Sequence, residues 1–424
     1  MNISELHKLF LEFPNISTDT RKITKNCLFF ALKGPNFNGN KFAEEALKKG
    51  ASYVIVDEEK FKTSKKTILV KSVLETLQAL ATFHRDYSKA QIISLTGSNG
   101  KTTTKELINL VLSKKYKTIA TKGNLNNHIG VPLTLLSIKE DTEIGIVEMG
   151  ANHQGEIAYL SNIAKPDFGY ITNFGKAHLE GFGGVEGVIK GKSELFDYLT
   201  ENNKHIFLNA DDTIQKEKLS TYIQKFGFSQ TNANYYKIEL LNTSPFVSLK
   251  FDNIELKTNL IGAYNFPNCC AAILMGKYFN VPLNQIKEAI ENYNPDNNRS
   301  QLIQKNGYKI ILDAYNANPT SMIAALENFK LIDSNNKVLF LGDMFELGET
   351  SSKEHQAIAD LSKNLGFNEV HLIGENFFEV DSNFRKYKSF EDLAKHLSKN
   401  SLAKSTILIK GSRGMALERV LEHL

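Results

Sequence analysis

The stretch Ile93-Ser-Leu-Thr-Gly-Ser-Asn-Gly-Lys-Thr-Thr-Thr104 is the most informative part of the chain, because an apolar run passes through a glycine-rich turn into a helix-like segment. The N–H groups of such a turn point at an anion, Lys101 adds positive charge, and the Thr102 hydroxyl can ligate magnesium. The stretch therefore predicts a site for the phosphates of ATP. One position departs from the usual phosphate loop, which has a glycine five residues before Gly100, where this chain has Leu95. The strand before the turn and the helix after it disfavour a chance Gly-Lys-Thr.

Length and composition limit the remaining possibilities. The 424 residues exceed what one hydrophobic core usually serves, so we expect two or three domains. The net charge of +4 is small and the lysines are scattered, which indicates no nucleic-acid or membrane partner. Cys27, Cys269 and Cys270 form no C-x-x-C pair, which disfavours disulfides and zinc. Without an export signal or a membrane-length apolar run, we expect a soluble cytoplasmic protein, with a monomer as the default.

The pattern of strands and helices predicts three α/β domains. Residues 1–88 contain strands at 27–32 and 52–57 with a helix at 42–49 between them, which indicates a small module. Residues 89–294 alternate apolar strands with helices, which is typical of a parallel sheet like that of P-loop ATPases. The predicted strands are 91–95, 143–148, 168–172 and 205–208, with antiparallel strands appended within 232–260.

The last region, residues 295–424, has the most regular alternation and predicts a second, Rossmann-like doubly wound sheet. Its predicted strands are 308–312, 337–341, 369–373 and 406–409. Ligands of open parallel sheets bind beyond the carboxyl ends of the strands, where this region places Asp313, Asp343, Lys410 and Arg413. Two acids and two cations at strand ends favour a binding face, although helix-capping acids and ordinary loop charges are the alternative.

Two further residues are expected beside the phosphate loop. Glu148 closes an apolar strand, so its carboxylate should lie at the same sheet edge and suits a magnesium ligand. His178 lies in the glycine-rich loop that follows the next strand, where it could contact a metal or a substrate. The alternatives are a helix-capping glutamate and a solvated loop histidine.

Together these residues resemble the Mur ligase family, the ATP-dependent enzymes that form amide bonds in bacterial cell-wall precursors. The resemblance spans nearly the whole chain and implies three domains, ATP as co-substrate and two Mg²⁺ sites. It implies that Lys101, Glu148, His178 and Lys192 are catalytic residues. Lys192, in Gly191-Lys-Ser-Glu-Leu-Phe196, falls where the family carries a carbamylated lysine that serves the second Mg²⁺.

The resemblance also assigns ligands to residues. Magnesium is expected at Thr102, Glu148, His178 and carbamylated Lys192. Nucleotide contacts are expected from Thr96, Gly97, Ser98, Asn99, Gly100, Lys101, Thr102, Thr103, Asn265, Arg299 and Asp313. The last two would reach ATP when the C-terminal domain closes. The segment Leu260-Ile-Gly-Ala-Tyr-Asn265 is similar to the family's Gly-x-His-Asn, but Tyr264 replaces the histidine, so no role is assigned to position 264.

Three segments are similar to the branch of the family that adds D-alanyl-D-alanine to UDP-MurNAc-tripeptide. They are residues 313–322, 341–349 and 410–413. Substrate contacts are implied for Ser17, Thr18, Asp19 and Arg21 in a UDP-binding segment, for Asn124, Asn126 and Asn127 in a substrate loop, and for Asn316, Asn318, Asp343, Lys410 and Arg413.

Two alternatives stay open from the sequence. One is a related ligase that adds a single amino acid to the precursor or glutamates to folate. The other is a nucleotide-dependent switch that forms no amide bond. The third residue of the tripeptide, diaminopimelate or lysine, is also left open.

Overall fold

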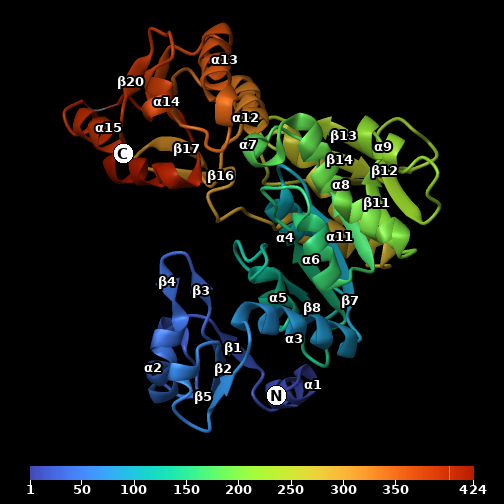
Figure 1. Ribbon diagram of the computed structural model, residues 1–424. Helices are drawn as coiled ribbons and strands as arrows, with labels where there is room; N and C mark the ends of the chain where they lie inside the picture. Colours follow the sequence, from blue (N-terminus) through green and yellow to red (C-terminus); the bar gives the residue numbers. More distant parts are fainter. Residues whose placement is uncertain (401) are drawn as a thin grey trace.

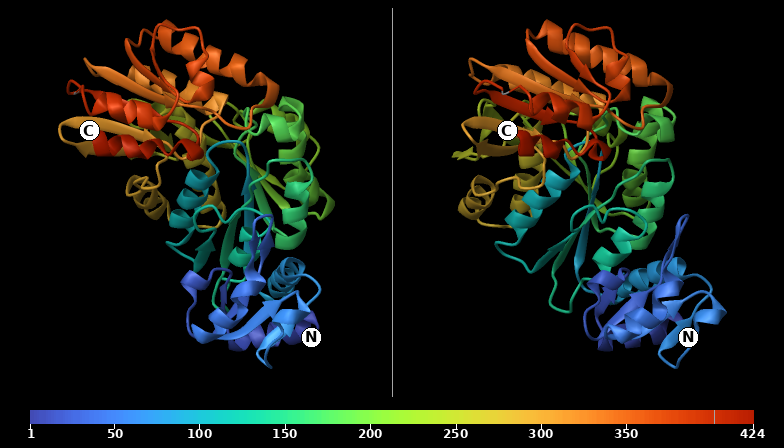
Figure 2. Two further views of the ribbon diagram at one scale, coloured as in Figure 1. Left: turned by 60° about the vertical axis from the view of Figure 1, so that its left-hand side comes forward. Right: turned by 90° about the vertical axis from the view of Figure 1, so that its left-hand side faces the viewer.

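The computed structural model describes residues 1–400 and 402–424. Three large sheets follow one another along the chain, and Figures 1 and 2 show the first and the last at opposite ends of the second. The expected α/β fold with three domains is confirmed. Within the described ranges, no helix combines the length and the apolar character that a membrane crossing requires.

The N-terminal domain contains a four-stranded parallel sheet in the order β1-β2-β5-β6. Strand β2 (Cys27–Phe30) is buried at every position, as expected for a strand covered on both faces. The other elements are α1 (Ile3–Glu12), β1 (Asn15–Ser17), the β3–β4 hairpin (Lys33–Gly34 and Phe37–Asn38), α2 (Ala43–Lys48), β5 (Ala51–Val56), β6 (Thr67–Leu69) and α3 (Val73–Tyr87). Helix α3 packs against α1 on one side and against helices of the central domain on the other, so it joins the two domains.

The central domain is built on a nine-stranded sheet in the order β15-β14-β13-β12-β11-β10-β7-β9-β8. Its strands are β7 (Gln91–Thr96), β8 (Thr118–Ala120), β9 (Ile144–Glu148), β10 (Phe168–Ile171), β11 (His205–Asn209), β12 (Lys225–Ser229), β13 (Tyr236–Asn242), β14 (Ser248–Phe251) and β15 (Ile254–Lys257). The strands from β8 to β13 pair in parallel, and β13, β14 and β15 pair antiparallel, as the sequence predicted.

The helices of the central domain connect these strands. They are α4 (Lys101–Leu112), α5 (Gly130–Leu135), α6 (Glu156–Ala164), α7 (Leu179–Phe182), α8 (Val185–Glu201), α9 (Thr213–Lys218), α10 (Phe266–Tyr278) and α11 (Leu283–Glu291). Helix α4 follows β7 directly and packs closely on α10, which is buried along almost its whole length. This packing fixes the start of α4 at the carboxyl ends of the strands.

The C-terminal domain contains a six-stranded sheet in the order β16-β17-β21-β18-β19-β20. Its elements are β16 (Gln301–Lys305), β17 (Tyr308–Asp313), α12 (Pro319–Leu331), β18 (Lys337–Gly342), α13 (Ser351–Asn364), β19 (Glu369–Ile373), α14 (Glu375–Phe378), β20 (Arg385–Tyr387), α15 (Phe390–Leu397) and β21 (Thr406–Lys410). Only the edge strand β16 is antiparallel among these described strands. Because β21 lies beside β17, Asp313 pairs in register with Lys410.

A histidine buried in this sheet should make the fold sensitive to acid. His371 on β19 stacks against Phe340 with ring centres 4.7 Å apart, and burial lowers its pKa to about 4. In the unfolded chain the pKa lies near 6.5, so the unfolded state binds more protons below that pH. This stability is therefore fully present above pH 6.5 and is lost as the pH falls toward 4.

We expect His371→Phe to remove about 2 kcal/mol of the stability loss that the wild type shows between about pH 7.5 and pH 5. Urea midpoints from circular dichroism at the two pH values, for both proteins, measure the difference. Equal pH dependence of the two midpoints would show that His371 titrates with an ordinary pKa.

Candidate active site

A cleft of about 800 Å³ lies between the phosphate-loop end of the central sheet and the C-terminal domain. Its wall includes many of the residues expected from the sequence. They are Ser98, Asn99, Gly100, Lys101, Thr102, Thr103, Asn124, Asn126, Asn127, Glu148, His178, Asn265, Arg299, Asp313, Asn316 and Lys410. Residues more than 300 positions apart in the chain thus line one space.

The phosphate loop makes a tight turn between β7 and α4. Gly97 lies against Thr172, because a Cβ atom on Gly97 would be 2.0 Å from the Thr172 hydroxyl oxygen. Gly100 is the N-cap residue of α4 and provides no side-chain acceptor, which leaves the first N–H groups of the helix available to an anion. Lys101 Nζ donates to the carbonyl oxygens of Gly97 at 2.7 Å and Ser98 at 3.2 Å.

The charge of Lys101 lacks full compensation in this arrangement. Burial lowers the pKa of Lys101, and the positive charge of Arg299 acts in the same direction, whereas Glu148 raises it. A polyphosphate in the cleft would supply the missing negative charge. The loop is therefore a suitable site for the phosphates of a nucleotide.

The glycine at position 100 has a steric reason that a substitution can test. Its φ is +80°, in the left-handed region, and a Cβ atom there would lie 2.6 Å from Asn268 Oδ1. We expect Gly100→Ala to cost about 1–3 kcal/mol of stability and to weaken nucleotide binding at least about tenfold, because the start of α4 must shift. Thermal unfolding and calorimetric titration with ADP measure the two effects. Wild-type ADP affinity in this variant would contradict the assigned role of the turn.

Glu148 and Thr102 form the part of the wall that suits a metal ion. Thr102 Oγ1 donates to Glu148 Oε2 at 2.9 Å, and Asn126 Nδ2 donates to Glu148 Oε1 at 2.7 Å. Glu148 is buried, and its backbone N–H donates to Thr121 Oγ1. Nowhere in the described residues do three or more His, Cys, Asp or Glu side chains converge as metal ligands. Mg²⁺ typically takes a few oxygen ligands from the protein, and phosphate and water complete its coordination shell. The oxygens of Thr102 and Glu148 therefore fit this ion.

Lys192 and His178 occupy different surroundings. Lys192, on α8, is fully buried, and its Nζ donates to the carbonyl oxygen of Ala151 at 3.0 Å, directly behind the cleft wall. Burial lowers the pKa of Lys192 well below its ordinary value, and the charge of Lys101 adds to the effect. His178 lies on the cleft wall and is paired through Nδ1 with Glu346 of the C-terminal domain.

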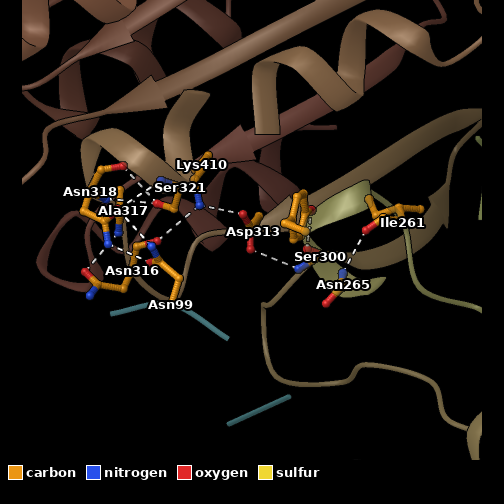
Figure 3. Close-up of polar contacts among 11 residues, drawn as sticks. Asn99, Ile261, Asn265, Ser300, Asp313, Asn316, Ala317, Asn318, Ser321 and Lys410 are labelled. Carbon is orange, nitrogen blue, oxygen red and sulfur yellow. Dashed lines mark hydrogen bonds and ion pairs between the residues drawn. The ribbon is translucent and has the colours of Figure 1, made fainter. Parts of the chain in front are cut away.

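The C-terminal wall places charged groups opposite the phosphate loop (Figure 3). Asp313 Oδ1 accepts a hydrogen bond from the backbone N–H of Ser300 at 3.0 Å, and Asp313 Oδ2 lies 2.5 Å from Lys410 Nζ. The guanidinium of Arg299 stacks on the ring of Tyr315 at 3.7 Å. On the opposite side of the cleft, Asn265 is buried and donates to the carbonyl oxygen of Ile261.

Direct contacts hold the two walls together. Asn318 Nδ2 donates to Asn99 Oδ1 of the phosphate loop at 2.7 Å (Figure 3). The backbone N–H of Lys176 donates to Thr320 Oγ1, and Lys176 Nζ pairs with Glu354 at 2.7 Å. Neither Lys176 nor Glu354 was predicted as a site residue, because a charge pair between distant segments has no local pattern.

Three predicted substrate residues of the C-terminal domain, Asn318, Asp343 and Arg413, are not part of the cleft wall. The side chain of Asn318 caps α12 and contacts Asn99. Asp343 is buried, and its carboxylate accepts hydrogen bonds from the backbone N–H groups of Asn376 and Phe377 at the start of α14. This is the helix-capping alternative. Arg413 points to solvent and pairs with Glu418 at 2.6 Å.

The predicted UDP segment lies in the N-terminal domain, away from the residues that line the cleft. Ser17 ends β1, Thr18 follows it, and Asp19 is the N-cap of a short 3-10 helix containing Arg21. The hydrogen bonds from Arg21 lower the pKa of Asp19 to about 2.

Thr96, the first predicted residue of the phosphate loop, is buried at the end of β7. It therefore offers its backbone to the cleft and not its side chain.

Sequence models of three Mur ligase domains match the chain in order. They are the Mur ligase family, catalytic domain at residues 12–87, the Mur ligase middle domain at 95–276, and the Mur ligase, glutamate ligase domain at 298–413. A relative from Buchnera aphidicola is named UDP-N-acetylmuramoyl-tripeptide–D-alanyl-D-alanine ligase. It is 35% identical, over 100% of this chain and 94% of its own length.

Two solved structures are similar over nearly their whole length. MurF from Acinetobacter baumannii has a TM-score of 0.86 at 28% identity, covering 99% of this chain and 97% of that one. MurF ligase from Thermotoga maritima, solved in complex with ADP, has a TM-score of 0.85 at 26% identity and covers 97% of each chain.

Proposed function

The chain belongs to the Mur ligase family, and from this premise we propose that it joins D-alanyl-D-alanine to UDP-MurNAc-tripeptide with conversion of ATP to ADP and phosphate. The observation that carries the proposal is the single cleft in which the phosphate loop faces Arg299, Asp313 and Lys410 of the C-terminal domain. The full-length similarity to ligases of this name supports the choice of substrates.

The reaction needs activation because a carboxylate is a poor acylating agent at neutral pH. The terminal carboxylate oxygen of the tripeptide attacks the γ-phosphorus of ATP, and the bond to ADP breaks. The amine of D-alanyl-D-alanine then attacks the acyl carbon, phosphate leaves from the tetrahedral intermediate, and the amine loses a proton. Catalysis on this scheme is mainly positioning and electrostatic stabilisation.

The residues of the chain divide this work. Lys101 and the first N–H groups of α4 bind the phosphates. The positive charge of Lys101 also offsets the negative charges that meet when the substrate carboxylate approaches the γ-phosphate. Thr102 and Glu148 would hold Mg²⁺, which screens the same charges when bound. A second Mg²⁺ would be held by His178 and by Lys192 as a carbamate. Asn265, Arg299 and Asp313 position the nucleotide, and the contact of Asn99 with Asn318 holds the C-terminal domain against the phosphate loop.

The remaining substrate assignments follow the same division. We assign the UDP moiety to Ser17, Thr18, Asp19 and Arg21, and the peptide to the loop containing Asn124, Asn126 and Asn127. Asn316 and Lys410 lie where D-alanyl-D-alanine would meet the cleft, whereas Asp343 would act only by fixing α14. We assign the enzyme to the cytoplasm, as a monomer, because its three cysteines are free and buried and so suit a reducing compartment.

The test is to incubate the protein with ATP, Mg²⁺, UDP-MurNAc-tripeptide and D-alanyl-D-alanine and to search for UDP-MurNAc-pentapeptide by mass spectrometry. Tripeptides ending in diaminopimelate and in lysine are compared. Product with single amino acids instead of the dipeptide would favour a related ligase. Phosphate release that needs neither peptide nor amine would favour a nucleotide-dependent switch.

A further inference from the structure

Tyr264 occupies a fixed position beside the nucleotide residues, although no step of the reaction assigned above uses it. It precedes Asn265 and lies on the cleft wall. Its ring packs across Gly262, where a Cβ atom would be 2.3 Å from the ring carbon Cε1. Gly262 has φ +87°, which a side chain rarely adopts, so backbone and ring position fit each other.

The hydroxyl of Tyr264 connects the central domain to the linker that enters the C-terminal sheet. It lies 2.8 Å from the hydroxyl of Ser300, which is buried. The backbone N–H of Ser300 donates to Asp313 Oδ1, and the other oxygen of Asp313 pairs with Lys410 (Figure 3). A continuous series of polar contacts therefore runs from the nucleotide side of the cleft to the acid on its opposite wall.

The linker itself has an unusual backbone. Asn298 and Ser300 both have left-handed φ angles, +57° and +52°, and Arg299 lies between them. A serine in this region costs about 1 kcal/mol and persists only where neighbouring groups fix it. The hydroxyl of Tyr264 and the carboxylate of Asp313 are the groups that hold Ser300 in this conformation. The turn formed by Asn298, Arg299 and Ser300 therefore fixes the position of Arg299, whose guanidinium stacks on Tyr315.

We propose that Tyr264 is a positioning residue for ATP, acting through its hydroxyl bond to Ser300 to set the turn that presents Arg299 and Asp313 to the nucleotide. The inference rests on the proposed function for the identity of the nucleotide. It predicts a larger effect on nucleotide binding than on the two peptide substrates, because the hydroxyl of Tyr264 contacts Ser300 directly and reaches Lys410 only through Asp313.

The test uses Tyr264→Phe, Ser300→Ala and the double variant. Each single variant should raise the KM for ATP about two- to tenfold, as expected for one lost hydrogen bond. The KM values for UDP-MurNAc-tripeptide and D-alanyl-D-alanine, and kcat, should stay within about twofold of wild type. The double variant should be no worse than the worse single variant, since both remove the same contact.

Tyr308→Phe is the matched control. It removes a tyrosine hydroxyl bond of the same length, 2.8 Å to the carbonyl oxygen of Leu402, outside the cleft, and should leave the KM for ATP unchanged. Calorimetric titration of each protein with AMP-PNP, a non-hydrolysable ATP analogue, reports the same loss without turnover.

Wild-type AMP-PNP affinity in Tyr264→Phe, or single-variant effects that multiply in the double variant, would overturn the positioning role. An equal rise in all three KM values would do the same, because it would indicate a general structural defect. Failure of the proposed function is distinct from these results: the wild type would bind AMP-PNP normally but form no pentapeptide.

Discussion

Replacing Lys101 with methionine should lower kcat/KM for ligation on the order of 10²- to 10³-fold while leaving the protein folded. Methionine keeps most of the volume of the side chain but removes the charge that would meet the phosphates. The γ-phosphate and the attacking carboxylate are both anionic, so their approach is costly unless a cation lies beside them. The loop carbonyls that Lys101 contacts here are weaker partners than a phosphate would be. Pentapeptide formation under varied ATP concentration measures the loss.

Lys105→Met provides the comparison, because Lys105 lies one turn further along the same helix and is buried, whereas Lys101 is half-buried on the cleft wall. Its Nζ donates to the carbonyl oxygen of Thr121 at 2.7 Å, outside the cleft wall. Both variants lose a lysine charge from α4, but only Lys101→Met should lose the reaction. If Lys101→Met kept more than about a tenth of wild-type kcat/KM, charge compensation by this lysine would be unimportant.

The sequence predicted the central strands well because apolar runs flanked by turns and helices are a local signal. The strands around the phosphate loop, β7, β9 and β10, were anticipated within a residue or two. The short strands β1, β6, β8 and β20 were missed, since three residues contain too little pattern to distinguish a strand from a loop. The edge strand β16 was missed because its sequence, Gln301-Leu-Ile-Gln-Lys305, does not alternate apolar with polar residues and none of its side chains is fully buried.

The site shows the same division between local and distant information. Strand ends placed Glu148 beside the phosphate loop of the central sheet, and Asp313 with Lys410 at the edge of the C-terminal sheet, because neighbouring parallel strands end at one edge. Only the family resemblance predicted that Asp313 reaches the nucleotide across the two domains. The strand-end argument did not distinguish Asp343, whose carboxylate turns toward α14 and whose strand end looks no different in the sequence. Contacts across the two domains, such as that of Tyr264 with Ser300, depend on domain packing and leave no trace in local spacing.

Replacing Lys192 with alanine should lower activity on the order of 100-fold, and added formate or acetate should partly restore it. A neutral amine combines with CO₂ to give a carbamate and a proton, which converts a cation into an anionic oxygen ligand. An ammonium would instead repel a magnesium ion. The burial that lowers the pKa of Lys192 favours the neutral amine, so acid should reverse the modification. Activity assays with and without formate or acetate measure the loss and its rescue. The carbamate signal in ¹³C NMR after labelling with ¹³C-bicarbonate measures the modification of Lys192.

The exposed Lys190, two residues earlier on the same helix, provides the matched variant. Lys190→Ala should keep wild-type activity and the carbamate signal, and added formate should leave its activity unchanged. Lys192→Arg keeps a positive charge but has no amine that reacts with CO₂, so it should be inactive and should not respond to carboxylates. A carbamate signal that persists in Lys192→Ala would place the modification elsewhere. Wild-type activity in Lys192→Ala would contradict a role for Lys192 as a metal ligand. The only contact of its amine that the substitution removes would then be the hydrogen bond to the carbonyl oxygen of Ala151.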